Sequence, residues 1–66
     1  MGSNINLQDN GGWTSLHYAV SSNSLESINL LLSNDANISI ADKNSRTAKD
    51  IADERGFINI VQLLNK

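Results

Sequence analysis

The chain has 66 residues, a formal net charge of −2 and no cysteine. The absence of cysteine excludes disulfide bonds and cysteine-ligated metal sites, and the five Lys and Arg residues form no basic stripe that would bind nucleic acid. No apolar run approaches the roughly 20 residues that cross a membrane, and no signal peptide is apparent, so we expect a small, soluble, intracellular chain of the cytoplasm.

The first predicted element is a tight turn that leads into a helix over residues 14–21. Residues 10–12, Asn-Gly-Gly, tolerate positive φ, so the chain can reverse there. Thr14 can accept a hydrogen bond from a backbone N–H at the helix start, and His17 can reach back toward the same turn, as in a capping box. The apolar face of this helix consists of Leu16, Ala19 and Val20.

A second helix is predicted over residues 25–33. Asn23 suits the left-handed turn that ends the first helix, and Ser24 can cap the second. Residues 34–37 then turn the chain, and the alternating residues 38–41 predict an extended arm. The apolar face of the second helix consists of Leu25, Ile28, Leu31 and Leu32.

The second half of the chain predicts the same elements with different residues. Thr47 and Asp50 can form a capping box for a helix over residues 47–55, and Gly56 can end that helix. A last helix follows over residues 57–64. Its apolar face consists of Ile58, Val61 and Leu64.

The two halves repeat with a period of 33 residues. This offset maps Asp9 onto Asp42 and Thr14 onto Thr47. Further pairs with the same offset are Ala19 and Ala52, Leu30 and Leu63, Leu31 and Leu64, Leu25 and Ile58, and Ile28 and Val61. A fixed period of this length indicates stacked units that bury a shared core between neighbours.

The motif Asp-x-x-Gly-x-Thr-x-Leu-His-x-Ala at residues 9–19, followed by a second aligned unit, resembles the ankyrin repeat family. The resemblance covers nearly the whole chain. It implies an all-α solenoid of two helix-turn-helix units with short hairpin-like turns, in one domain over residues 1–66. Residues 1–8 would be the tail of a preceding repeat, 9–41 the first repeat, and 42–66 a second, C-terminal capping-type repeat. The start of the chain is either native sequence of a longer array or a cloning remnant: Met1, Gly2 and Ser3.

Three residues depart from the family pattern. Ser45 stands where the turn glycine is usual, so it must avoid positive φ or bear strain. Lys49 and Asp53 stand at the positions of Leu16 and Val20, which face a neighbouring repeat, and charge there favours a C-terminal cap. The uncovered N-terminal face of the first repeat would either self-associate with a second copy or contact a neighbouring domain, or else the chain is only marginally stable alone.

No catalytic, metal or cofactor site is predicted. His17 is the sole histidine, and its match to the cap position favours a structural role over proton transfer or metal binding. Turns, capping and surface charge explain the aspartates, and the sequence offers no nucleophile with a base and an orienting group. We therefore expect that the chain is not an enzyme and binds no cofactor.

The resemblance implies that the hairpin tips and the exposed side of the inner helices hold another protein. Trp13 on this surface either anchors the partner or covers the inner helix. The predicted function is protein–protein interaction, and the alternative is a structural C-terminal cap without partner contacts of its own. Carried over by position, the partner-binding surface consists of Gln8, Asn10, Trp13, Ser21, Ser22, Ala41, Lys43, Asn44, Arg46, Glu54 and Arg55.

Overall fold

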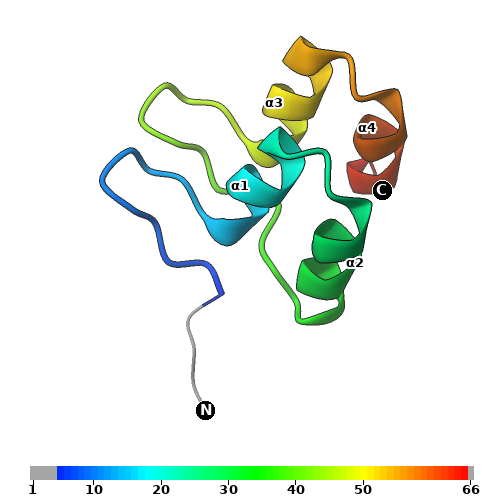
Figure 1. Cartoon of the computed structure of the whole chain (residues 1–66). Helices are drawn as coiled ribbons and strands as arrows, with labels where there is room; N and C mark the ends of the chain where they lie inside the picture. The colour runs from blue at the N-terminus through cyan, green and yellow to red at the C-terminus, as the bar shows by residue number, and fades with distance from the viewer. Residues whose placement is uncertain (1–4, 66) are drawn as a thin grey trace.

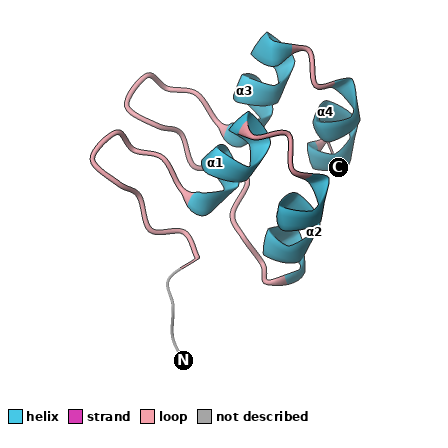
Figure 2. Ribbon diagram, viewed as in Figure 1, coloured by secondary structure: helices cyan, strands magenta, loops and turns pink. Residues whose placement is uncertain are grey.

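The computed structural model describes residues 5–65, and all regular structure in that range is helical. The elements are α1 (Ser15–Ser21), α2 (Leu25–Ser33), α3 (Ala48–Arg55) and α4 (Ile58–Leu64). Helix α1 pairs with α2, and α3 pairs with α4. The two pairs stack side by side (Figure 1), and loops connect the helices (Figure 2). The predicted all-α fold class is confirmed. None of the helices described is long and apolar enough to cross a membrane.

The helices form two layers, and the loops that bear the candidate site project from one of them. The inner helices α1 and α3 pack against each other, and α2 and α4 lie on the side of them away from the loops (Figure 1). Residues 8–13, the first finger, precede α1, and residues 41–46, the second finger, precede α3. Both fingers extend away from the outer helices (Figure 1). The fold therefore places two parallel loops beside the inner layer.

Local hydrogen bonds define where the inner helices begin. The Thr14 N–H donates to His17 Nδ1 at 3.1 Å, and the His17 N–H donates to Thr14 Oγ1 at 3.4 Å. Thr47 and Asp50 make the equivalent pair at 3.1 and 3.2 Å. Both predicted capping boxes are present, and each satisfies backbone donors that the helix itself leaves unpaired.

Left-handed residues follow the same helices. Asn23 after α1 has a φ of 54°, and Gly56 after α3 has a φ of 75°, as the sequence predicts. Ser24 precedes α2, but its hydroxyl donates to Ser27 Oγ at 3.1 Å and makes no cap hydrogen bond. Ser24 is thus the N-cap residue of α2, as predicted, but without the side-chain hydrogen bond to the backbone that a serine cap can make.

The core is aliphatic and lies between the two helix pairs. The predicted apolar face of α1 is buried throughout, whereas Leu25 and Ile58 are 41% and 58% exposed. Their predicted place on the buried apolar face is wrong, because each begins an outer helix at a point that faces solvent. In α4 the buried residues are Ile60 and the predicted Leu64. The buried cluster consists of Leu16, Ala19, Val20, Ile28, Ala48, Ile51, Ala52, Ile60 and Leu64.

The predicted extended arm at residues 38–41 is also wrong. Residues 38 and 39, at the start of this segment, form another turn, in which the Ser39 N–H donates to Asn37 Oδ1 at 2.8 Å. The alternation in the sequence matches alternating burial, since Ile38 and Ile40 are half-buried and Ser39 is exposed. Burial of every second residue thus occurs here without a strand.

Candidate functional site

The two fingers are built on the same hydrogen-bonded turn. In the first finger, Asp9 Oδ1 accepts hydrogen bonds from the backbone N–H groups of Gly11 and Trp13, both at 2.9 Å. In the second, Asp42 Oδ1 accepts from the two equivalent N–H groups at 2.8 and 3.0 Å. An aspartate that binds the backbone two and four residues ahead fixes a turn locally. Each finger therefore holds its tip in a defined shape.

Contacts between the fingers fix their relative position. Gln8 Nε2 donates to the carbonyl oxygens of Gly12 at 2.8 Å and Ala41 at 3.0 Å, and the Lys43 N–H donates to Gly11 O at 3.2 Å. Gly12 permits this approach, because a Cβ there would lie 2.7 Å from the Lys43 nitrogen. The finger side is therefore one continuous surface.

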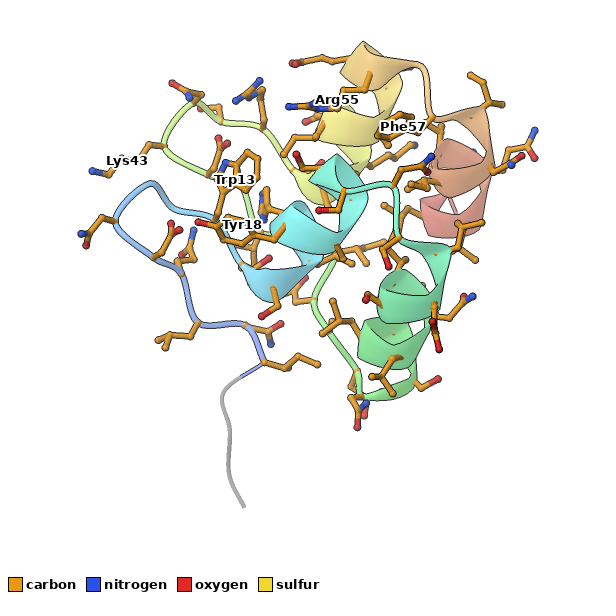
Figure 3. The ribbon with its side chains drawn as sticks, viewed as in Figure 1. Trp13, Tyr18, Lys43, Arg55 and Phe57 are labelled. Carbon is orange, nitrogen blue, oxygen red and sulfur yellow. The ribbon has the colours of Figure 1, made fainter. Side chains whose placement is uncertain are left out.

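Trp13 joins the first finger to the second. Its indole Nε1 donates to Asp42 Oδ2 at 2.9 Å. The ring stacks on His17 with centroids 5.8 Å apart and meets Tyr18 edge-on at 4.9 Å. Trp13 and Tyr18 lie together beside α1 (Figure 3). Because its N–H is used within the chain and the ring is half-buried, Trp13 can offer a partner only the remaining exposed part of the ring.

His17 is 1% exposed and uses both ring nitrogens in the structure. Its Nδ1 accepts the Thr14 N–H, so the proton lies on Nε2, which donates to Arg46 O at 3.0 Å. The histidine thus links the cap of α1 to the second finger. Within residues 5–65, no group of three His, Asp or Glu side chains is placed to hold a metal ion.

The finger carboxylates have lowered pKa values. The Tyr18 hydroxyl donates to Asp9 Oδ2, and this hydrogen bond is the main cause of the lowered pKa of Asp9 and the raised pKa of Tyr18. For Asp42, the backbone N–H of Arg46 lowers the pKa most, against an opposing effect of burial, and the Trp13 indole lowers it further. Both fingers therefore keep an ionised aspartate at neutral pH.

The positive charge of Arg46 is compensated within the chain. Its Nη1 donates to Glu54 Oε1 at 2.9 Å, and its Nε lies 3.7 Å from Asp42 Oδ2. Lys43 in the second finger and Arg55 at the end of α3 are exposed, and neither forms an ion pair within residues 5–65 (Figure 3). Lys43 and Arg55 are thus the cations that this surface can offer to a partner.

The residues predicted to bind a partner differ in their exposure and in the contacts they make within the chain. Gln8, Trp13 and Arg46 hold the fingers in place through the hydrogen bonds above. Ser21 is half-buried. The exposed members are Gln8, whose amide is used between the fingers, and Asn10, Ser22, Ala41, Lys43, Asn44, Glu54 and Arg55.

Two further residues, which sequence reasoning missed, border the same surface. Leu7 and Tyr18 are 69% and 52% exposed. With Gln8, Asp9, Trp13 and Ser15 they line a hollow of about 220 Å³. Tyr18 could have been found as a large aromatic residue off the apolar face of its helix. Leu7 has no comparable local signal.

Comparisons with known proteins agree with this architecture. The family model of ankyrin repeats, in three copies, matches residues 1–66. Ankyrin repeat domain-containing protein 37 of Homo sapiens is 40% identical over 63 residues, which cover 96% of this chain and 40% of that protein. The protein of the same name from Xenopus tropicalis is 36% identical over 63 residues, which cover 96% and 39% respectively.

The chain thus spans about 40% of the length of these relatives. The family match extends over the whole sequence, and the structure has the two stacked helix pairs with paired fingers that the resemblance implied. The chain belongs to the ankyrin repeat family.

Proposed function

We propose that this chain is a non-catalytic module that binds a segment of another protein on its finger side. Ankyrin repeats are in general protein–protein interaction modules. The observation that carries the proposal is the joining of the two fingers by Gln8 and by the hydrogen bond between Trp13 and Asp42. A surface that is ordered before binding loses little conformational entropy when a partner docks.

The apolar part of the proposed surface is the hollow beside the first finger. Leu7, Tyr18 and the exposed part of Trp13 border it. Its volume of about 220 Å³ suits one inserted side chain better than a whole small-molecule ligand. Aromatic residues near the centre of an interface supply much of its binding energy, so Trp13 and Tyr18 together form the proposed anchor.

The polar part of the proposed surface lies on the two fingers and at the end of α3. Asn10 and Asn44 offer side-chain amides at the finger tips, and Lys43 and Arg55 offer uncompensated positive charge. Complementary charge steers a partner and sets its register more than it adds affinity. The preferred partner segment therefore carries carboxylates that can reach Lys43 and Arg55, and an apolar side chain for the hollow.

Affinity capture with the immobilised chain, followed by binding measurements on each purified captured protein, tests this proposal. Lys43→Glu combined with Arg55→Glu should weaken binding of a true partner about tenfold or more, because both cations then become repulsive. The control adds the same type of charge on the outer helices, Asn29→Glu with Gln62→Glu, and should bind as the wild type does. Equal affinities of the two double variants for every captured protein would refute the proposal.

A second role is supported by the charges on α3. Lys49 and Asp53 stand at the positions of buried Leu16 and Val20, yet Asp53 is exposed and Lys49 Nζ donates to Asn65 Oδ1 at 3.0 Å. We propose that this face of α3 closes the stack against water. Lys49→Leu with Asp53→Val should then cause self-association in sedimentation experiments. A double variant that self-associates no more than the wild type would argue against the capping role of α3.

A further inference from the structure

Two donors compete for one carboxylate oxygen where the fingers meet. Asp42 Oδ2 accepts the Trp13 indole N–H at 2.9 Å, and Arg46 Nε lies 3.7 Å from the same oxygen. The second distance is too long for a hydrogen bond between nitrogen and oxygen. The Asp42 side chain is 0% exposed, so water does not reach it freely. Of the two donors, the indole therefore holds this oxygen.

The Arg46 Nε–H is left without a hydrogen bond. The nitrogen is buried, although the side chain as a whole is 35% exposed, and it has no hydrogen-bond partner within residues 5–65. A buried donor without an acceptor raises the free energy of the folded state. Glu54 accepts from Nη1 of the same guanidinium at 2.9 Å and so holds it in place. Arg46 is thus an unused donor next to Asp42.

The Trp13 side chain can move without displacing the first finger. The Trp13 backbone N–H donates to Asp9 Oδ1 at 2.9 Å, and the Trp13 carbonyl oxygen accepts the Asp9 N–H at 2.9 Å. The main chain is therefore held independently of the ring. The Gln8 amide, which donates to Ala41 O at 3.0 Å, joins the fingers separately. Release of the indole from Asp42 would leave both fingers in position.

Release of the ring has a cost that keeps it bound in the free chain. The indole stacks on His17 and meets Tyr18 edge-on, and both contacts are lost when the ring moves away. An apolar or aromatic partner surface can replace them. At the buried carboxylate of Asp42, by contrast, no hydrogen bond need be lost, because Arg46 Nε can take the place of the indole.

We propose that Trp13 and Arg46 are alternative donors to Asp42, and that Trp13 is a releasable anchor residue. In the closed state the indole bonds to Asp42 Oδ2. In the open state the Arg46 Nε–H bonds to this oxygen, and the whole indole, with its N–H free, is available to a partner. Use of the released indole by a partner rests on the proposed function, whereas the exchange of donors is a property of the free chain.

The first experiment removes the indole N–H. Trp13→Phe keeps an aromatic ring at this position but leaves Asp42 Oδ2 without the indole donor. Exchange of the arginine Nε–H protons with water is measured by NMR in the variant and in the wild type. Arg46 and Arg55 are the two arginines of the chain. Arg55 is exposed and forms no ion pair within residues 5–65, so it is the internal control.

We expect the Arg46 Nε–H to exchange about tenfold more slowly in Trp13→Phe, because it gains a hydrogen bond to a carboxylate. The Arg55 proton should exchange as in the wild type. If Trp13 only holds the fingers together, its loss loosens the second finger and the Arg46 proton exchanges faster. Unchanged or faster exchange at Arg46 would therefore overturn the proposal.

Arg46→Met tests the same competition from the other side. The variant keeps most of the aliphatic stem but has no donor, so opening would leave Asp42 Oδ2 without a hydrogen bond. Trp13 is the sole tryptophan, so its indole N–H gives one NMR signal, and the buried Val20 in α1 supplies the reference amide. Glu54→Gln is the matched control, because it removes the other partner of Arg46 but leaves the Nε–H.

Relative to the Val20 amide, the indole N–H should exchange about tenfold more slowly in Arg46→Met than in the wild type, because local opening becomes less favourable. It should exchange at the wild-type relative rate in Glu54→Gln. Equal or faster relative exchange in Arg46→Met would also overturn the proposal. Failure of every captured protein to bind would leave both exchange results unchanged, so it bears on the proposed function alone.

Discussion

Gly12 and Ser45 occupy equivalent places in the two fingers, with φ values of 82° and 63°. Gly12 is needed for space as well as for conformation, because a Cβ there would lie 2.7 Å from Lys43 N. Ser45 bears the cost of a left-handed conformation in a residue with a Cβ, about 1 kcal/mol. A glycine at this position would avoid the strain, but it would also give the unfolded chain more conformational freedom. Part of the cost of Ser45 relative to glycine is therefore offset.

Ser45→Gly should therefore raise the free energy of unfolding by about 0.5 kcal/mol. Gly12→Ala should lower it by about 2 kcal/mol or more, since it adds a backbone clash to the conformational strain. Urea unfolding measures both changes. A destabilising Ser45→Gly, or a neutral Gly12→Ala, would show that the two fingers do not differ in this way.

Asp42 should make the stability of the chain depend on pH. Its pKa is lowered from the ordinary value of 3.8, first by the hydrogen bond from the Arg46 backbone N–H. The ionised carboxylate is therefore favoured in the folded state, and this contribution is fully present above the unfolded pKa of about 4. It is lost as the pH falls through the lower folded pKa. Asp9 adds a loss of the same sign.

Asp42→Asn should make the decline in stability below about pH 4 less steep. The variant keeps an acceptor oxygen for the backbone but removes the charge. Asp53→Asn is the matched control, because Asp53 is exposed and its side chain makes no hydrogen bond within residues 5–65. Unfolding midpoints measured from neutral pH to acid give the slopes, and identical slopes for Asp42→Asn and the wild type would rule out this role of Asp42.

The two inner helices begin with the same type of cap but in different surroundings. In α1 the capping side chain is His17, which is 1% exposed and also donates to the Arg46 carbonyl at 3.0 Å. In α3 it is Asp50, which is exposed and bonds only to Thr47 among the described residues. Removing His17 leaves the Thr14 N–H without its imidazole acceptor and takes away one of the two hydrogen bonds to the Arg46 carbonyl, which also accepts from the Asp42 N–H at 2.9 Å. At the exposed Asp50, water can replace the lost side chain.

His17→Ala should lower the free energy of unfolding by about 2–3 kcal/mol, and Asp50→Ala by about 1 kcal/mol or less. Urea unfolding of the two variants gives the comparison. Equal losses of unfolding free energy in the two variants would mean that the hydrogen bond from His17 to the second finger adds no stability beyond that of the helix cap.

Local and periodic features of this fold could be predicted from the sequence. Thr14 and Thr47 precede their capping partners by three residues, and the offset of 33 residues located the second helix pair. Helical periodicity predicted that Leu25 and Ile58 are buried, but both are exposed. An apolar residue at the start of a helix is buried only if a neighbouring element covers it.

The parts of the site that could not be predicted depend on contacts between repeats. The sequence alone does not decide whether Trp13 anchors a partner or packs within the chain, because its hydrogen-bond partner Asp42 lies 29 residues away. Gln8 was expected on the partner surface, but its amide holds Ala41 of the second finger. Such pairings follow from how the fingers pack together, and no local pattern encodes them.

At the scale of the whole molecule, the two repeats should unfold as one cooperative unit. The inner helices share a buried cluster, and two repeats are fewer than the three that a repeat stack usually needs for stability. Neither repeat therefore has a core of its own that would survive separation. Trp13 fluorescence reports on the join between the fingers, and far-UV circular dichroism reports on all helices.

Ile51→Val tests this coupling, because Ile51 belongs to the second repeat, is 2% exposed and lies in the cluster shared with α1. The variant should lower the free energy of unfolding by about 0.5–1.5 kcal/mol. The Trp13 and circular dichroism midpoints should shift equally, although the substitution and the indole lie in different repeats. Ile58→Val, at a residue that is 58% exposed, should shift neither by more than about 0.5 kcal/mol. A Trp13 transition that stays at the wild-type midpoint while the helical signal moves would mean that the first repeat folds independently of the second.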